Sequence, residues 1–266
     1  MVGYQELGTE NGGKTMICPT FLNVGESNKV SLADLKVDGY GGAPSYDTKK
    51  KTWSGGCSGG KFVLNVLNPN GGADASYYWI HFGKKNNPDP IGPGWFADAE
   101  GTPIEGGAEK VKFDAGDSFW TTGSGYKLVP AGAVNQFDIS ITTASGGKSA
   151  IGNCTPVDLK LNDLTVDPES YGGAPSYDTK KKTWSGGCSG GKFVLNILNP
   201  NGGADASYYW IHFGKKNNPD PIGPGWFADA EGTPIEGGAD KVPVPAGQAF
   251  WTTGSGYKLI IPAPEL

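Results

Sequence analysis

Apolar and polar residues alternate with a period of two over many short stretches of this chain. The stretches are bounded by Gly, Asn or Pro, and none shows the 3.6-residue period of an amphipathic helix. Period two is typical of a strand with one buried face, so the pattern predicts an all-β fold built as a small sandwich or barrel. The strands expected in the first part of the chain are 2–7, 14–23, 30–37, 61–68, 75–83, 94–98, 109–113, 117–122 and 126–129.

The segment 40–111 recurs almost unchanged at 171–242, and only two of the 72 paired positions differ. A repeat of this length is a whole domain rather than one turn of a solenoid. The sequence therefore predicts two tandem near-identical β-sandwich or barrel-like domains, 1–131 and 132–266. The joint expected at 130–133 is too short for a flexible tether, which favours a fixed relative orientation.

Composition narrows the possible functions. The chain has 44 Gly and 20 Pro, but its 11% aromatic content argues against disorder. The net charge is -5, and all 22 basic residues are lysine. Arginine is the preferred side chain for phosphates and base edges, so nucleic-acid binding is not expected. No apolar run reaches the roughly 18 residues that a membrane span needs.

Four cysteines allow three disulfide pairings. Cys57 and Cys188 are the same position in the two copies, and Cys18 and Cys154 both follow a Gly-Gly-Lys. The repeat therefore favours Cys18–Cys57 and Cys154–Cys188, one bond in each domain, with four buried thiols as the alternative. Disulfides indicate an oxidising compartment. The first residues do not form a signal peptide, so the chain is either cytosolic or starts at a processed terminus. The cysteines favour the second alternative, and we expect an extracellular or cell-surface chain whose signal has been removed.

The only two histidines lie in the repeated motif Tyr-Tyr-Trp-Ile-His-Phe-Gly. Alternation places Tyr78, Ile80 and Phe82 on one face of this strand, and that more apolar face is expected to point to the core. The opposite face is open to three interpretations: cross-strand packing beneath a loop, a protein–protein contact or a sugar-binding platform. This candidate interaction surface comprises Tyr77, Trp79, His81, Tyr208, Trp210 and His212.

Other chemistry finds little support, so we expect no catalytic residue, cofactor or metal site. Gly-Ser-Gly at 123–125 has the character of a turn rather than a nucleophile elbow, and each domain has one histidine inside a strand. The loop 86–90 offers oxygens that would suit calcium, but two lysines precede it and a bare loop is favoured. Lys-Lys-Lys at 49–51 and 180–182 indicates solvated turns that could pair with acidic loops of a neighbouring molecule.

Three motifs resemble repeats found in uncharacterised secreted or surface β-proteins of bacteria. They are Val-Gly-Tyr at 2–4, Gly-Trp-Phe at 94–96 and Val-Pro-Ala-Gly-Gln-Ala-Phe-Trp at 244–251. The resemblance covers most of each unit and implies an extracellular location and a β fold, without indicating any chemistry. The first copy departs from it at 113–117, so that loop is expected to serve the junction between the domains.

The duplication itself suggests a function. Two near-identical domains expose the same patches, and a heterologous contact between them leaves one face of each kind free. Such a contact propagates, which predicts a homopolymer assembled head to tail. Differences at the junctions are expected in the divergent segments 1–38, 112–118, 129–167 and 243–249.

The sequence thus favours an extracellular structural subunit of a filament or surface layer, and not an enzyme. The alternative is a tandem carbohydrate-binding module whose twin sites raise avidity on an extracellular polysaccharide.

Overall fold

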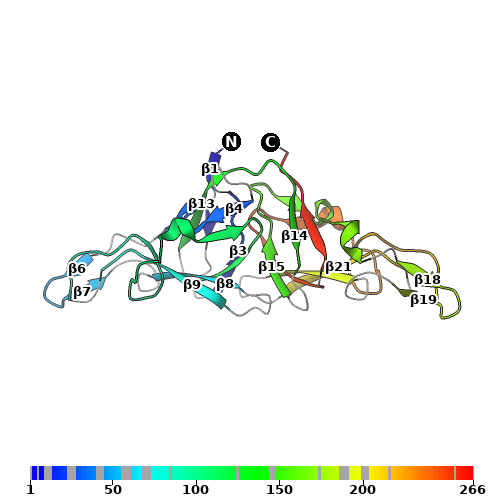
Figure 1. Cartoon of the computed structure of the whole chain (residues 1–266), viewed down its shortest axis with the longest axis horizontal. Coiled ribbons are helices and arrows are strands. Elements are labelled where there is room, and N and C mark those ends of the chain that lie inside the picture. Colours follow the sequence, from blue (N-terminus) through cyan, green and yellow to red (C-terminus); the bar gives the residue numbers. More distant parts are fainter. Residues whose placement is uncertain are drawn as a thin grey trace.

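The computed structural model of the chain is elongated, with both chain ends near the middle of the long axis and a β-hairpin at each far end (Figure 1). We call 2–133 the first half and 134–265 the second half. The residues that the structure describes are 2–4, 6–8, 14–22, 28–39, 45–54, 61–67, 73–83, 86–123, 126–143, 148–172, 175–185, 192–198, 204–214, 217–254 and 256–265.

The expected all-β class is confirmed, because the described residues form antiparallel strands and short 3-10 helices but no α-helix. The 3-10 helices of the first half are η1 (Leu32–Asp34) and η3 (Ala108–Lys110). Its strands are β1 (Val2–Tyr4), β2 (Leu7–Gly8), β3 (Lys14–Ile17), β4 (Lys29–Ser31), β5 (Leu35–Asp38), β6 (Ser45–Asp47), β7 (Thr52–Ser54), β8 (Lys61–Leu67), β9 (Ala73–Ile80), β10 (Gly94–Phe96), β11 (Lys112–Asp114), β12 (Phe119–Thr122) and β13 (Lys127–Ala133).

The second half has a matching series of elements. Its 3-10 helices are η4 (Leu161–Asp163), η5 (Pro168–Tyr171) and η7 (Ala239–Lys241). Its strands are β14 (Ile139–Thr142), β15 (Lys148–Gly152), β16 (Leu159–Lys160), β17 (Thr165–Val166), β18 (Ser176–Asp178), β19 (Thr183–Ser185), β20 (Lys192–Leu198), β21 (Ala204–Ile211), β22 (Gly225–Phe227), β23 (Pro243–Val244), β24 (Ala249–Thr253) and β25 (Lys258–Ile261).

Each half contains a five-stranded sheet, and the two sheets have the same strand order. From the middle of the molecule outward the orders are β3-β12-β8-β9-β10 and β15-β24-β20-β21-β22. A second sheet lies beside each of them, with β13 pairing β1, β2 and β5 in the first half and β25 pairing β14 and β17 in the second. Fully buried residues of both kinds of sheet, such as Leu64, Phe119 and Leu128, belong to one core.

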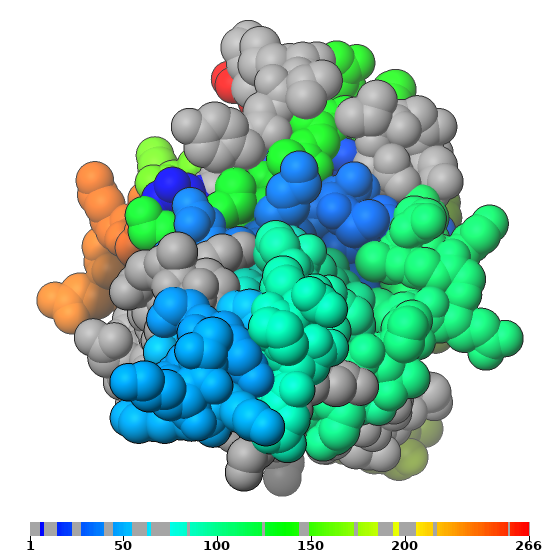
Figure 2. All heavy atoms as spheres, turned by 90° about the vertical axis from the view of Figure 1, so that its left-hand side faces the viewer, coloured from blue at the N-terminus to red at the C-terminus, as the bar shows by residue number. Residues whose placement is uncertain are grey.

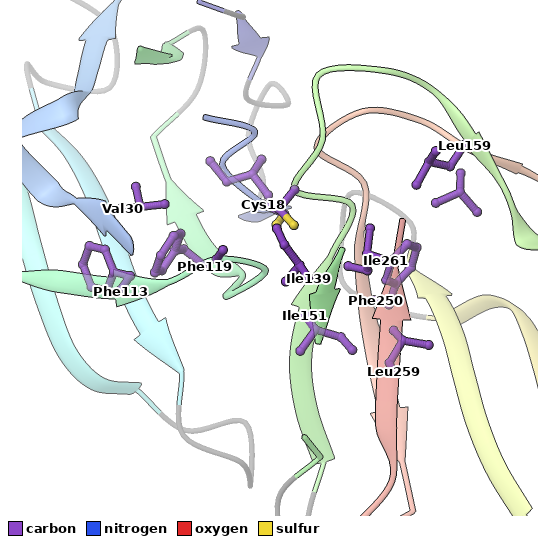
Figure 3. Packing of buried hydrophobic residues seen from close by; sticks show 14 of the residues in the cluster. Cys18, Val30, Phe113, Phe119, Ile139, Ile151, Leu159, Phe250, Leu259 and Ile261 are labelled. Carbon is purple, nitrogen blue, oxygen red and sulfur yellow. The ribbon is translucent and has the colours of Figure 1, made fainter. Parts of the chain in front are cut away.

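That core is continuous between the halves. Figure 3 shows Val30, Phe113 and Phe119 on one side, with Ile139 and Ile151 on the other, and Cys18 lies between them. The strands that face the middle carry apolar side chains at the positions that meet, so the contact buries them as an ordinary core would. We therefore expect the two halves to unfold together.

The contact is reciprocal. Superposing the strand registers makes Ile17 equivalent to Ile151, since they pair with Phe119 and Phe250 respectively, which are the same position of the repeat. An isolated β-bridge joins Ile17 to Gln248, and its counterpart joins Ile151 to Asp117.

The backbone hydrogen bonds show the same reciprocity. The Cys18 N–H donates to the Gly247 carbonyl over 3.1 Å, and the Gly152 N–H donates to the Gly116 carbonyl over 3.0 Å. A contact is isologous when every pair of residues that meets across it is matched by a second pair, formed by their counterparts in the other half.

The expected strands largely match the structure, with differences that have local causes. The run 30–37 is interrupted because the Ser31 hydroxyl accepts from the Ala33 N–H (3.3 Å) and caps η1, which separates β4 from β5. The run 14–23 is a strand only to Ile17, after which the chain turns into the contact. The expected joint 130–133 belongs to β13, where it pairs with β1 and β5.

Candidate interaction site

The hairpin β6–β7 and its counterpart β18–β19 lie at the two ends of the long axis (Figure 1). The Asp47 carboxylate shapes the first turn by accepting from the N–H groups of Lys49 (2.9 Å) and Lys50 (3.0 Å). Lys51 then adopts a φ of 54°, which closes the turn. An Asp that holds the amides two and three residues later is a usual way to make such a turn. The lysines are thereby presented at its apex.

The hairpin is held against the loop 86–90. The Trp53 indole N–H donates to the Asn87 carbonyl (2.9 Å), and the Asn86 N–H donates to the Lys51 carbonyl (2.9 Å). The Trp53 ring lies so close to Gly83 that a Cβ there would come within 2.6 Å of the indole nitrogen. These contacts fix the hairpin on its support.

The hairpin of the second half repeats this geometry. The Asp178 carboxylate accepts from the N–H groups of Lys180 (2.9 Å) and Lys181 (3.0 Å), and the Trp184 indole donates to the Asn218 carbonyl (2.9 Å). All six turn lysines are exposed. Among the described residues one ion pair involves them, that between Lys181 and Asp178, at 4.0 Å and with side chains 80% and 40% exposed. The molecule therefore presents the same basic turn twice.

Each half also contains an acidic segment that follows its five-stranded sheet. In the first half it follows β10 and covers 97–110, where Glu100, Glu105 and Glu109 are exposed. Figure 2 shows the hairpin (light blue) and the segment after β10 (aquamarine to green) on the same end face. Ile104 anchors the acidic segment against the core. Exposed lysines and exposed carboxylates are therefore both present in the outer part of this half, and the repeat has the same residues in the second half. We call the hairpin and the acidic segment of one half its end site.

The acidic segment has a defined backbone. Asp98 accepts from the N–H groups of Glu100 (3.0 Å) and Thr102 (2.9 Å). Hydrogen bonds from the Thr102 side chain and backbone lower the pKa of Asp98, so this carboxylate stays charged well below neutral pH. Asp229 has the same partners in the second half, and Thr233 lowers its pKa in the same way.

The aromatic face expected to form an interaction surface instead points to the core. Trp79, His81, Trp210 and His212 are all buried, and Tyr77 and Tyr208 are half-buried against the core, so the expectation of an outward face is wrong. The reason is a partner that sequence alternation does not show. Trp95 on β10 lies opposite Trp79, with ring centroids 5.3 Å apart in an edge-to-face arrangement.

Hydrogen bonds secure these rings in place. The Trp95 indole donates to the Leu35 carbonyl (2.6 Å), and the Trp226 indole donates to the Leu164 carbonyl (2.6 Å). Burial lowers the pKa of His81 and of His212, which keeps both imidazoles neutral at physiological pH. Cross-strand packing, one of the three interpretations left open by the sequence, is what the described side chains do.

The predicted cysteine pairing is also wrong, because Cys18 and Cys154 are free, buried thiols. Cys57 and Cys188 lie outside the described residues. The two described cysteines are not equivalent positions: Cys18 directly follows Ile17, whereas Cys154 comes three residues after Ile151. The position equivalent to Cys18 is Gly152.

A cavity and the carboxylates that line it form a second feature of the surface. A cavity of about 510 Å³ adjoins the C-terminal segment and is lined by parts of 157–163 and 262–265. Its carboxylates Asp158 and Asp163 accept from the backbone N–H groups of Ala246 (2.9 Å) and Lys160 (2.8 Å), which gives them a structural role. Within the described residues, no three His, Cys, Asp or Glu side chains gather as a metal site would require.

Comparisons with protein-family models, curated proteins and solved structures find no match to this chain. The resemblance to bacterial surface repeats therefore stays a prediction. In the described part of the chain, no helix has the length and apolar character needed to cross a membrane.

The end site could be predicted only in part. The Lys-Lys-Lys turns and their possible acidic partners were visible in the sequence, but the flanking strands β6 and β7 were not predicted. The alternation of Tyr46 and Asp47 before the turn with Thr52 and Trp53 after it is the signal that could have indicated the hairpin.

Proposed function

We propose that the chain consists of two copies of one β domain and is an extracellular structural subunit that associates through its two end sites. The observation that carries the proposal is the twin placement of basic hairpins and acidic segments at opposite ends of one elongated molecule. A subunit of a filament or layer needs two such ends that do not interfere with each other.

Head-to-tail growth was predicted from a heterologous contact between the two domains. The contact that joins Ile17 to Gln248 and Ile151 to Asp117 is instead isologous and closes on itself. Growth must therefore use other surfaces. Two equivalent ends that point in opposite directions also produce an open polymer, with each end meeting the end of another molecule.

Charge complementarity supports this contact between ends. The exposed lysines 49–51 of one molecule can face the exposed Glu100, Glu105 and Glu109 of another, and the pairing is returned in the opposite direction. Complementary charges steer association and fix register, and they act within about 10 Å at ordinary ionic strength. The proposed assembly should therefore weaken with salt.

A charge-swap experiment tests the proposal. Lys50→Glu with Lys181→Glu changes the net charge from -5 to -9, since each of the two substitutions replaces one positive charge with one negative charge. We expect weaker association in sedimentation at low salt, by roughly tenfold or more. Glu105→Lys with Glu236→Lys should weaken it as well. Mixing the two variants should restore mixed assemblies that negative-stain microscopy can resolve.

A matched control separates the end sites from net charge. Lys36→Glu with Lys160→Glu gives the same net charge, and both of these lysines are exposed outside the end sites. This control should associate much more strongly than the hairpin variant. A protein that remains monomeric at high concentration and low salt would overturn the proposal.

The tandem carbohydrate-binding module stays as a second candidate because the hairpins carry half-exposed aromatic pairs. Tyr46 and Trp53 have centroids 5.4 Å apart, and Tyr177 and Trp184 are 5.5 Å apart. Under this alternative, Tyr46→Ala with Tyr177→Ala abolishes retention on an insoluble acidic polysaccharide. Phe137→Ala is the control, since this side chain is 72% exposed elsewhere.

A further inference from the structure

Cys18 and Cys154 come from different halves of the chain and meet in the middle of the contact. Both side chains are fully buried. The Cys18 thiol donates to the Pro19 carbonyl (3.7 Å), and the neighbouring Cys154 thiol helps to raise the pKa of Cys18. Figure 3 shows two sulfur atoms next to each other where Cys18 is labelled. Two thiols that belong to sequence positions so far apart are brought together only by the folded contact.

Both cysteines have backbones that are held in place. The Cys18 N–H donates to the Gly247 carbonyl (3.1 Å). Cys154 lies between Asn153 and Thr155, whose side chains are buried. The Asn153 carboxamide donates to the carbonyl of Val157 (3.0 Å) and accepts from the Thr155 N–H (3.0 Å) and hydroxyl (2.7 Å). The two sulfur atoms are therefore positioned by a rigid frame.

The two halves approach each other closely at this point. A Cβ on Gly152 would come within 2.5 Å of the Cys18 Cβ. Gly152 is the equivalent of Cys18, so the two equivalent positions face each other and only one of them has room for a side chain. The Cys18 side chain occupies that room and reaches the sulfur of Cys154.

We propose that Cys18 and Cys154 are a disulfide-forming pair that covalently links the two halves when the chain folds in the presence of a small-molecule disulfide. The bond would cross-link the two halves across the isologous contact. It does not depend on association through the end sites.

The chemistry is two thiol–disulfide exchanges with oxidised glutathione as the oxidant. The Cys18 thiolate attacks one sulfur of oxidised glutathione, which forms a mixed disulfide and releases one glutathione thiolate. The Cys154 thiolate then attacks the Cys18 sulfur, which forms the Cys18–Cys154 bond and expels the second glutathione. The two protons of the protein thiols end on two reduced glutathione molecules, and oxidised glutathione takes up the two electrons.

Burial determines when this reaction takes place. Burial raises the pKa of the Cys18 thiol well above its usual value, and the neighbouring Cys154 thiol raises this pKa further. A protonated, inaccessible thiol reacts slowly, so the bond should form during folding. Adding oxidised glutathione to the reduced, folded chain should give a rate at least about tenfold below that of refolding in the same mixture.

The experiment uses the full chain with Cys57→Ser and Cys188→Ser, so that only the proposed pair remains. After refolding with glutathione, the protein is unfolded in denaturant and its thiols are alkylated. We expect an intact mass lower by two hydrogen atoms than the reduced form, no alkylation, and one cross-linked peptide containing Cys18 and Cys154. Reduction should lower the midpoint of thermal unfolding by roughly 10 °C.

Further substitution gives the control. Cys154→Ser added to this variant should leave Cys18 alkylated and abolish the response to reductant. Two alkylated cysteines in the original variant, or disulfide-linked dimers, would overturn the proposal. If the variant does not fold, peptide mapping of the wild-type chain decides, and a Cys18–Cys57 link would contradict the proposal.

Discussion

The middle of the molecule and its two ends obey different constraints. The ends come from the nearly unchanged segments 40–111 and 171–242. Corresponding hydrogen bonds in their two hairpins have lengths that agree to within 0.1 Å. The described residues that join the halves, such as Ile17, Gly116 and Gly152, all lie in the divergent segments. The loop 113–117, which was expected to serve the junction between the domains, supplies Gly116 and Asp117 to this contact.

The difference follows from the symmetry of the contact. At the ends the two copies do not face each other, so identical residues can occupy equivalent positions in both copies. In the middle, equivalent positions approach each other, and two identical side chains would compete for one space. Cys18 against Gly152 is the clearest case, because only one of the two positions can carry a Cβ.

The largest expected effect is that of Gly152→Ala. The new Cβ would lie 2.5 Å from the Cys18 Cβ and 2.6 Å from the Gln248 carbonyl oxygen, which is backbone and cannot move aside cheaply. We expect a loss of about 3 kcal/mol in the free energy of unfolding, measured by urea denaturation. Gly225→Ala is the control, since its nearest atom would be 4.0 Å away, and equal losses would contradict this account of the middle.

Asp117 is expected to make stability depend on pH. Desolvation by burial raises the pKa of Asp117 to about 6. The Asp114 N–H donates to this carboxylate (2.9 Å), which lowers the pKa by less than burial raises it. The folded chain holds this proton more tightly than the unfolded chain, whose Asp titrates near pH 4. Stability therefore falls as pH rises from about 4 to about 6 and is then level, with a contribution of roughly 1–3 kcal/mol.

The control for this pH dependence is Asp117→Asn, which cannot titrate. It should remove the decrease between pH 4 and pH 6 and leave the variant more stable than the wild type at pH 7. Gln248 occupies the equivalent position of the second half, and an uncharged side chain is thus already accommodated there. An unchanged pH profile in the variant would assign the dependence to another group.

Trp95→Phe and Trp226→Phe test whether the ends are energetically equal. Each substitution removes an indole N–H that donates to a buried carbonyl over 2.6 Å. We expect each to lower the free energy of unfolding by about 1–2 kcal/mol. The two losses should agree within about 0.5 kcal/mol, whereas clearly unequal losses in thermal or urea unfolding would show that the repeats are not equivalent in energy.

The smallest effect is expected for Lys181→Ala. Its ion pair with Asp178 is 4.0 Å long and exposed, so the change in stability should be below about 0.5 kcal/mol. Calorimetry checks this value. A larger loss would mean that the turn lysines serve folding rather than association.

Period two identified most of the strands because each has one buried face, as in β5, where Leu35 and Val37 are buried and Lys36 and Asp38 are exposed. It could not show which face of β9 is covered, since that depends on Trp95 of the neighbouring strand. The cysteine pairing failed for a similar reason. The equivalence of Cys18 and Cys154 was inferred from a common Gly-Gly-Lys, whereas strand register sets Cys18 against Gly152.

The steric exclusion at Gly152 also limits how the two repeats can evolve. Gene conversion can homogenise 40–111 with 171–242, because each copy folds there without facing its own twin. Conversion that copied 14–18 onto 148–152 would place Cys at both positions and bring two β-carbons into the space of one. Conversion in the opposite direction would place Gly at both and remove the Cys18 side chain from the contact. Segments exchanged between the two repeats should therefore end before Cys18 and Gly152, and the two halves remain different where they contact each other.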